Sequence, residues 1–234
     1  MIEKRPFSSL GQFENDWLNA HYHFSFSGYR DPARMNWGAL RVWNDDTIQP
    51  KTGFPPHSHS DMEIITYVRT GAITHEDSMG NRGRTEAGDV QVMSAGSGVA
   101  HAEFNLEDEA TTLYQIWIMP KERGGRPSWG AAKFPKGDRA GSLATLASGF
   151  AADQEAGALP IRQDARILAA TLKPGQSVSH TLAPGRHAYL ALAKGEASVN
   201  GIALGPRDGA AIRDESDIRV TASDDAEIVL VDSP

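Results

Sequence analysis

Two short segments of the sequence each carry two metal-ligating side chains one residue apart. The first contains His57 and His59, and the second contains His101 and Glu103. In an extended strand, residues i and i+2 point to the same face with a rise of about 6.6 Å between them, so each pair presents its side chains in one direction. If the two strands face one another inside a barrel, three imidazoles and one carboxylate meet at one point.

These ligand types indicate a catalytic metal site. The chain contains no cysteine, so any metal must be held by His, Asp or Glu. A set of imidazole and carboxylate ligands suits a divalent ion such as Fe, Mn, Co, Ni, Cu or Zn. Four ligands without thiolate are typical of a catalytic rather than a structural site. Pro55 and Pro56 keep the approach to His57 extended, because each proline fixes its own φ and biases the preceding residue away from helix.

The other histidines near the motifs are interpreted as structural or solvated. His21 and His23 have the same spacing, but they run into an aromatic segment and no second pair is assigned to them. His75 precedes Glu76 and Asp77 in an expected turn, where a solvated side chain is predicted. Four apolar neighbours of the motifs are expected to pack in the barrel core rather than to line a cavity, namely Phe26, Met62, Met93 and Trp117.

The surrounding sequence predicts an all-β fold. Its apolar runs are short and bounded by Gly, Pro, Asn or Asp, which is typical of many brief strands. The runs are 38–43, 62–68, 89–93, 112–119, 165–172, 187–193, 218–222 and 226–232. A helix is expected only within 142–157, which is rich in Ala and Leu but is interrupted by Gly149.

A stretch rich in Gly, Pro and Ala divides the chain. It runs from Pro120 to Pro160 with little strand pattern, so we predict two β modules, residues 1–135 and 136–234. A weak internal repeat supports this division. The repeat aligns segments 48–53, 66–74 and 87–93 with segments 172–177, 190–198 and 206–212.

Charge and apolar patterning argue against several classes of function. The formal net charge is −7, which disfavours a phosphate-binding surface because affinity for nucleic acid comes mainly from Lys and Arg. No apolar stretch approaches the ~20 residues of a membrane helix, and residues 1–10 lack the apolar segment of a secretory signal. We therefore expect a cytoplasmic protein that binds neither nucleic acid nor a membrane.

The residues from His57 to Asn105 resemble the two cupin motifs, and more narrowly those of the pirin family of bicupins. The resemblance is carried by HSHSDMEIITYVRTGAITHEDSMGN, followed by AGDVQVMSAGSGVAHAEFN. It extends to HYHFSFSGYRDP at 21–32 and to LYQIWIMP at 113–120. The C-terminal half resembles the family only in outline.

This resemblance implies a fold and a site. The fold is a tandem of two cupin barrels of the jelly-roll type. The site is a mononuclear, iron-like metal centre in the first barrel, with His57, His59, His101 and Glu103 as its ligands. Glu63 stays open as a competing ligand, because many cupins take their carboxylate from that position. The implied cofactor is Fe(II), with Ni, Mn, Co, Cu or Zn as alternatives.

The resemblance also implies an activity. Pirin-like proteins are known for quercetin 2,3-dioxygenase activity, so the expected reaction is the O2-dependent opening of a flavonol ring with release of carbon monoxide. The implied partners are a flavonol-like aromatic substrate and dioxygen, and Glu103 is expected to act also as general base. Two other functions stay open: a metal-dependent redox sensor that binds a protein partner, and a cupin isomerase or hydrolase that uses the metal as a Lewis acid. The sequence does not indicate the oligomeric state.

The second module is expected to bind no metal. Carried across at the same offset, the repeat places Thr181, Ala183, Val220 and Ala222 at the four ligand positions. None of them offers an imidazole or a carboxylate. We therefore expect residues 136–234 to form a metal-free barrel that packs against the first one and shields it.

Overall fold

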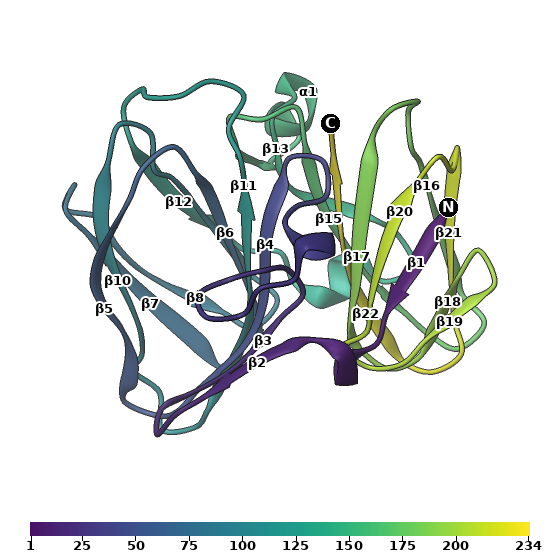
Figure 1. Cartoon of the computed structure of the whole chain (residues 1–234), viewed down its shortest axis with the longest axis horizontal. Coiled ribbons are helices and arrows are strands. Elements are labelled where there is room, and N and C mark those ends of the chain that lie inside the picture. The colour runs from purple at the N-terminus through teal and green to yellow at the C-terminus, as the bar shows by residue number, and fades with distance from the viewer.

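Buried and partly exposed residues alternate along the strand that carries the second predicted ligand pair. In β10 (Val99–Asn105), Val99, His101, Glu103 and Asn105 are buried, whereas the residues between them are partly exposed. A period of two is expected for a strand that turns one face toward a barrel interior. The computed structural model, which describes residues 1–234, has two such barrels side by side (Figure 1). The predicted all-β fold of two tandem barrels is confirmed.

The first barrel consists of two antiparallel sheets. In spatial order, the larger sheet contains β12 (Ser128–Ala132), β9 (Val90–Ser94), β6 (Glu63–Thr70), β11 (Thr111–Ile118), β4 (Leu40–Ile48), β3 (Leu18–Tyr22) and β2 (Gly11–Glu14). The smaller sheet contains β5 (Thr52–His59), β10, β7 (Ala72–Asp77) and β8 (Arg82–Glu86). The interior between these sheets receives the side chains of both predicted ligand pairs.

The second barrel repeats this arrangement. Its larger sheet contains β1 (Ile2–Arg5), β20 (Gly209–Arg213), β17 (His187–Lys194), β22 (Ala226–Ser233), β15 (Arg166–Leu172), β13 (Ala144–Ser148) and β14 (Leu159–Pro160). Its smaller sheet contains β16 (Ser177–Thr181), β21 (Asp217–Ala222), β18 (Ala197–Val199) and β19 (Ile202–Leu204). In the larger sheets, β9, β6, β11 and β4 of the first barrel correspond to β20, β17, β22 and β15 of the second.

The internal repeat read from the sequence agrees with this correspondence. Gly71 and Gly195, which the repeat aligns, both lie in the turn that leads from the larger to the smaller sheet, with φ of +74° and +76°. Side chains other than glycine rarely adopt such angles. A Cβ atom at either position would also collide with a neighbouring segment, at Thr111 in the first barrel and at Asp225 in the second. The same close crossing is therefore built twice.

Helices are few and short. The structure contains α1 (Ala151–Glu155) and three 3-10 helices, η1 (Phe7–Ser9), η2 (Pro32–Arg34) and η3 (Lys136–Arg139). The helix expected within 142–157 is thus mostly wrong, because the apolar residues of its first part form β13 and pair with β15. Only one short turn after Gly149 is helical. None of the helices has the length and the apolar character needed to span a bilayer.

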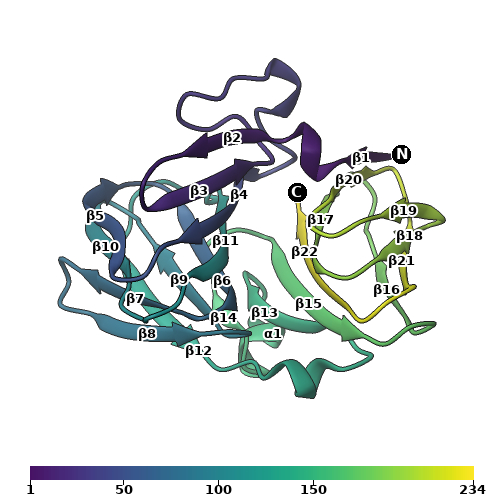
Figure 2. The same cartoon turned by 90° about the horizontal axis from the view of Figure 1, so that it is seen from below.

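The first strand crosses from one barrel to the other. β1 pairs with β20 of the second barrel, whereas β2 and β3 belong to the first (Figure 2). The linker strand β12 takes the matching place at the edge of the first barrel, where it pairs with β9. The connection that follows β12 leads through η3 into the second barrel.

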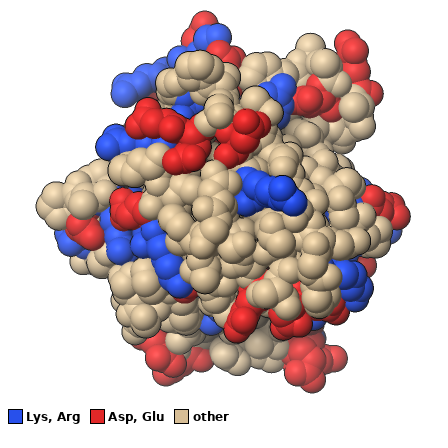
Figure 3. Space-filling view, turned by 90° about the vertical axis from the view of Figure 1, so that its right-hand side faces the viewer, with Lys and Arg blue, Asp and Glu red and all other residues tan.

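A shared apolar core joins the barrels. One continuous cluster of buried residues includes Trp43 and Tyr114 of the first barrel and Tyr189 and Val229 of the second. His23 is buried at this junction, with its Nδ1 2.8 Å from the hydroxyl of Tyr189, which agrees with its predicted structural role. On the outer face of the second barrel, Lys and Arg are interspersed with Asp and Glu (Figure 3).

Candidate metal centre

The strands β5 and β10 bring three of the predicted ligands together. They pair antiparallel, with His101 directly opposite His57 and Val99 opposite His59. The ring centroids of His57 lie 4.8 Å from His59 and 4.5 Å from His101, and those of His59 and His101 are 5.0 Å apart. The ligand atoms of the three histidines lie within 4.8 Å of one another. This is a spacing that a single ion can bridge with small side-chain adjustments.

The free nitrogens of this cluster fit a metal. Nδ1 of His57 lies 2.8 Å from the carbonyl oxygen of Pro55, so its N–H donates there and Nε2 is left free. Nε2 of His59 and Nε2 of His101 are buried without a hydrogen-bond partner in the protein. Leaving buried polar atoms unpaired costs about 1–3 kcal/mol each, so two in one cluster indicate a ligand. A divalent transition metal supplies a partner to all three nitrogens at once.

Burial also keeps these rings neutral. Burial, reinforced by the neighbouring His101 and His57, lowers the pKa of His59 to about 4. Burial, with His57 and His75 nearby, lowers the pKa of His101 to about 3. At neutral pH both rings therefore have the lone pair that metal binding requires.

Glu103 lies beside the three histidines but is held by three hydrogen bonds. Its Oε1 accepts from Gln91 Nε2 at 2.7 Å and from Thr66 Oγ1 at 3.1 Å, and its Oε2 accepts from Gln115 Nε2 at 2.9 Å. A carboxylate offers about four lone-pair positions, so about one is left for a metal or a proton. The carboxylate lies within 4.8 Å of ligand atoms of His101 and His75, but it does not form one such group with His57 and His59.

The donors to Glu103 come from one row of residues across the larger sheet. Gln91 of β9 is opposite Thr66 of β6, and Thr66 is opposite Gln115 of β11. Adjacent strands place directly opposite residues on the same face, so the row presents three polar side chains to the barrel interior. The next residue in the row is Asn44 of β4. Sequence reasoning missed this row because it depends on the register between strands far apart in the chain.

His75 is buried, and the expectation of a solvated side chain is wrong. It lies in β7 directly opposite Glu103, with no exposed side-chain surface. Its ring stacks on Trp129 at 4.9 Å, its Nδ1 is 3.4 Å from Nδ1 of His101, and its Nε2 is 3.1 Å from Oδ2 of Asp77. The signal that could have found it is the strand period, because His75 follows the apolar Ile73 by two positions. His75 thus forms a second layer behind His101.

The competing carboxylate Glu63 lies apart from this cluster. It accepts hydrogen bonds from Ser94 Oγ at 2.5 Å and from the backbone N–H of Arg162 at 3.1 Å. Arg162 follows the linker into the second barrel, so Glu63 fastens the two halves together. No group of three potential ligands includes it.

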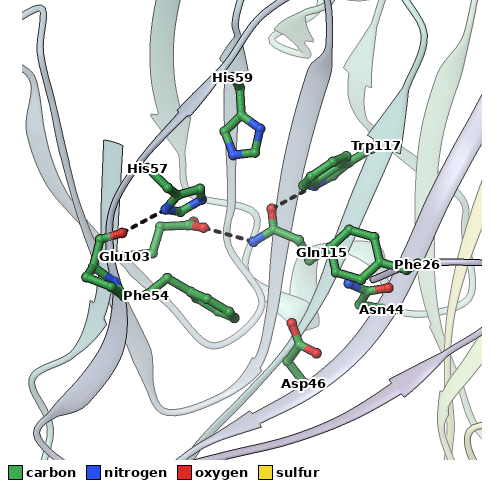
Figure 4. A pocket seen from close by; sticks show the side chains of 10 residues that line it. Phe26, Asn44, Asp46, Phe54, His57, His59, Glu103, Gln115 and Trp117 are labelled. Carbon is green, nitrogen blue, oxygen red and sulfur yellow. Dashed lines mark hydrogen bonds between the residues drawn. The ribbon is translucent and has the colours of Figure 1, made fainter. Parts of the chain in front are cut away.

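A cavity of about 260 Å³ opens beside the histidines (Figure 4). Its aromatic walls are Phe26, Phe54 and Trp117. Phe26 and Trp117 also pack against buried apolar clusters, so the expectation that they belong to the core rather than to a cavity wall is only partly right. Met93, in contrast, is buried in a small apolar cluster against which Met62 packs. The polar lining consists of Asn44, Asp46, His57, His59, Glu103 and Gln115. The cavity thus offers flat apolar walls next to the candidate ligands, which suits a planar aromatic molecule.

The second barrel keeps one histidine at the corresponding place. Ile218 pairs with His180 as His101 pairs with His57, and Val220 pairs with Val199, which the repeat aligns with His75. The residues corresponding to His57, His101 and Glu103 are therefore His180, Ile218 and Val220. In β16 the structure thus places the counterpart one residue before the expected Thr181. In β21 it places the counterparts two residues before the expected Val220 and Ala222. Both groups of three potential ligands lie in the first barrel. Nε2 of His180 is 2.8 Å from Oδ2 of Asp232.

Comparison with known proteins covers both halves of the chain. Residues 3–118 match the sequence profile of the Pirin family, and residues 146–233 match that of the quercetinase C-terminal cupin domain. A pirin-like protein of Caulobacter vibrioides is 63% identical over 233 residues, with 100% of both chains covered. A quercetin 2,3-dioxygenase of Escherichia coli K12 is 41% identical over 236 residues, which cover 100% of this chain and 99% of the relative. The crystal structure of the bacterial pirin YhhW from Escherichia coli in complex with nickel(II) has a TM-score of 0.93 at 38% identity, covering 100% of this chain and 99% of that one.

Proposed function

The chain belongs to the pirin family, and from this premise we propose that it is a metal-dependent dioxygenase acting on flavonols. His57, His59, His101 and Glu103 bind one divalent transition metal, with Fe(II) as the working ion. The reaction is the O2-dependent opening of the flavonol ring with release of carbon monoxide, as the name of the Escherichia coli relative suggests. The single observation that carries the proposal is the pair of buried, unpartnered Nε2 atoms of His59 and His101 beside an aromatic-walled cavity.

A divalent metal held by these residues would lower the pKa of a coordinated hydroxyl, as it does for bound water. The protein supplies the remaining elements of the reaction. Phe26, Phe54 and Trp117 pack against the flat faces of the flavonol and exclude water from its reactive ring. Glu103 accepts the hydroxyl proton when it is released from the metal, because its three hydrogen bonds leave about one lone pair for either partner. Gln115 holds this carboxylate in place and is itself fixed by the indole N–H of Trp117, at 3.2 Å.

The second barrel, residues 136–234, serves packing and binds no metal in this proposal. At the ligand positions it has two aliphatic residues, Ile218 and Val220, and one histidine, His180, that is paired with Asp232. A single imidazole that is hydrogen-bonded to a carboxylate does not form a chelating set.

Metal analysis and oxygen uptake together test the proposal. Protein expressed without added metal is analysed for bound metal, reloaded with Fe(II), and assayed for oxygen consumption and carbon monoxide release with quercetin. We expect one metal per chain and consumption of both substrates. The H101→Ala variant should lose metal and activity together, whereas H187→Ala, a matched change in the second barrel, should lose neither.

One metal per chain with no oxygen consumption would contradict the enzymatic role while keeping the metal centre. That result would favour a redox sensor, whose affinity for a protein partner changes between Fe(II) and Fe(III). Turnover by the Zn-loaded protein in the absence of oxygen would favour a Lewis-acid isomerase or hydrolase instead. Nickel is included in the reloading series, because a related structure contains it.

A further inference from the structure

Two polar side chains in the cavity have no task in the proposed reaction. Asn44 and Asp46 lie two positions apart on β4 and point to the same face, with exposed fractions of 3% and 2%. Oδ1 of each is buried without a hydrogen-bond partner in the protein. Both residues line the cavity, and Figure 4 shows them on the opposite side of it from His59.

The polar neighbours of Asn44 on the same face all make hydrogen bonds within the protein. Gln91, Thr66 and Gln115 precede Asn44 in the polar row across the larger sheet, and all three donate to Glu103. Asn44 is the fourth member of the row, and its side chain makes no hydrogen bond within the protein. Three members of the row therefore position Glu103. The fourth member, Asn44, faces the cavity together with Asp46, which lies two positions further along β4.

The fold does not require polar residues at these places. In the second barrel, pairing register and the repeat identify Leu168 and Ala170 of β15 as the counterparts of Asn44 and Asp46. The counterparts of Thr66, Gln115 and Gln91 are Leu190, Leu230 and Ala210. Aliphatic side chains thus fill the corresponding interior of the second barrel, which we propose binds no ligand. Unpaired polar groups in its place are costly, which indicates that a ligand completes them.

We propose that Asn44 and Asp46 form a second recognition point, which binds ring hydroxyl groups of the substrate at the end remote from the histidines. This inference rests on the proposed function and narrows its substrate class to polyhydroxylated aromatic compounds. Each side chain offers an oxygen that accepts a hydrogen bond from a phenolic hydroxyl, and the amide of Asn44 also donates. Their spacing of two residues along one strand suits two hydroxyls on the same ring.

The burial of Asp46 favours a neutral partner over a cationic one. Burial, together with the carboxylates of Asp45 and Glu103, raises the pKa of Asp46 well above its usual range. A carboxyl group can accept a hydrogen bond from a phenolic hydroxyl in either protonation state, whereas an ammonium group needs the charged form, which burial disfavours. Phenolic hydroxyls therefore fit this end of the cavity better than an ammonium group.

A comparison of two flavonols tests the recognition point. Quercetin and 3-hydroxyflavone share the hydroxyl and carbonyl groups that face the metal, but 3-hydroxyflavone lacks the other ring hydroxyls. Their dissociation constants are measured by anaerobic absorbance titration of the metal-loaded protein. We expect the wild-type protein to bind quercetin about tenfold tighter, as one or two hydrogen bonds allow. In the N44→Leu/D46→Leu variant, this ratio should fall to about one, with metal content unchanged.

The control is F26→Leu, which alters a cavity wall without a polar group and should leave the ratio of the two dissociation constants unchanged. Asp46→Asn keeps both the shape and the hydrogen-bonding capacity of the side chain, so it should retain most of the preference for quercetin over 3-hydroxyflavone. This variant reports on the site if the double variant folds poorly. An unchanged ratio in the double variant would overturn the inference and leave the proposed function intact. Failure of the metal-loaded wild-type protein to bind either flavonol would overturn both.

Discussion

At the scale of single residues, the contact between His101 and His75 sets the direction of a hydrogen-bond chain. If His101 binds the metal through Nε2, its Nδ1 carries the proton and donates to Nδ1 of His75. Nε2 of His75 then carries a proton and donates to Asp77, whose carboxylate also accepts from Asn81. Such outer partners fix the tautomer and the orientation of a metal-binding histidine.

Removal of this outer partner should weaken metal binding. H75→Phe keeps a flat ring against Trp129 but has no nitrogen to accept from His101, so we expect a 10- to 100-fold loss of metal affinity. The dissociation constant is measured by competition with a chromogenic chelator. H187→Phe, the same change in the second barrel, should bind metal as the wild type does.

D77→Asn separates orientation from direct ligation in the same assay. Asp77 belongs to neither group of three potential ligands, so a weakening in this variant arises without loss of a ligand, through its hydrogen bond to His75 or through its charge beside His101. Unchanged affinity in both H75→Phe and D77→Asn would remove the positioning role.

Acid should destabilise the metal-free protein. The pKa of His59 is about 4 and that of His101 about 3 in the folded state, against about 6.5 in an unfolded chain. Above pH ~6.5 both rings are neutral in the folded and in the unfolded state, so the free energy of unfolding does not depend on their titration. Below this pH only the unfolded state takes up protons at these rings. The free energy of unfolding therefore decreases until the pH approaches the folded pKa values. Urea denaturation with chelator present at about pH 7.5 and about pH 5 measures the difference. In H59→Gln/H101→Gln protein the decrease should be smaller, and an equal decrease would refute this origin.

Residue types and spacing in the sequence indicate the two candidate ligand pairs. They do not indicate the side chains that hold those candidate ligands in place. The spacing of His57 and His59 is visible because both lie in one strand with a period of two. The hydrogen bonds from Gln91 and Gln115 to Glu103 are not visible, because they depend on which strands are neighbours and in what register. The acidic neighbours of His75 predict a solvated side chain, but Glu76 points outward and the carboxylate of Asp77 accepts a hydrogen bond from His75.

At the scale of elements, β5 and β10 approach each other unusually closely at Gly53. A Cβ atom there would collide with the backbone of Glu103 and Phe104. The register of β10 against β5 shifts between His101 and Glu103, just where this approach occurs. Gly53 therefore allows the irregular pairing of β5 and β10, the two strands that carry the candidate ligand pairs.

G53→Ala should disturb the centre without touching a ligand. We expect a loss of stability of about 1–3 kcal/mol from overpacking together with weaker metal binding, because β5 must move away from β10. Thermal unfolding and chelator competition measure the two effects. G137→Ala is the control, since a Cβ atom meets nothing within 4 Å there. Normal metal affinity in a destabilised G53→Ala protein would show that strand spacing does not set the ligand geometry.

Most strands could be predicted, but their edges and the linker could not. The run 187–193 coincides with β17 to within one residue because its apolar residues are bounded by turn signals. The segment that contains β13 was expected to be helical because Ala and Leu favour helix. Pairing with β15 overrides that preference, and nothing in the local sequence announces the partner.

At the scale of the whole molecule, the linker helix η3 ties the barrels together electrostatically. Arg139 is buried and donates to the hydroxyl of Tyr67 in the first barrel, and this hydroxyl donates to Glu227 in the second. Lys136 also donates to Glu227, at 2.7 Å. One carboxylate of the second barrel thus compensates two cations from the linker.

E227→Ala should therefore destabilise the whole chain. It leaves the guanidinium of Arg139 buried without its carboxylate, and breaking such a pair costs about 3–5 kcal/mol. Equilibrium denaturation measures this loss, with E86→Ala, which removes an exposed partner of Arg84, as the control expected to cost about 1 kcal/mol or less. Equal effects of the two substitutions would show that the network contributes little.

The crossing of β1 imposes an order on assembly during synthesis. Every strand of the first barrel lies between Gly11 and Ala132, so this half has all its parts as soon as β12 leaves the ribosome. The pairing of Ile2 with Ile212 must wait until almost the entire polypeptide has emerged, since domains form from the amino-terminal side first. The nascent chain therefore holds every strand of the first barrel, with the candidate metal ligands, before its first residues can pair with the last strands of the second barrel.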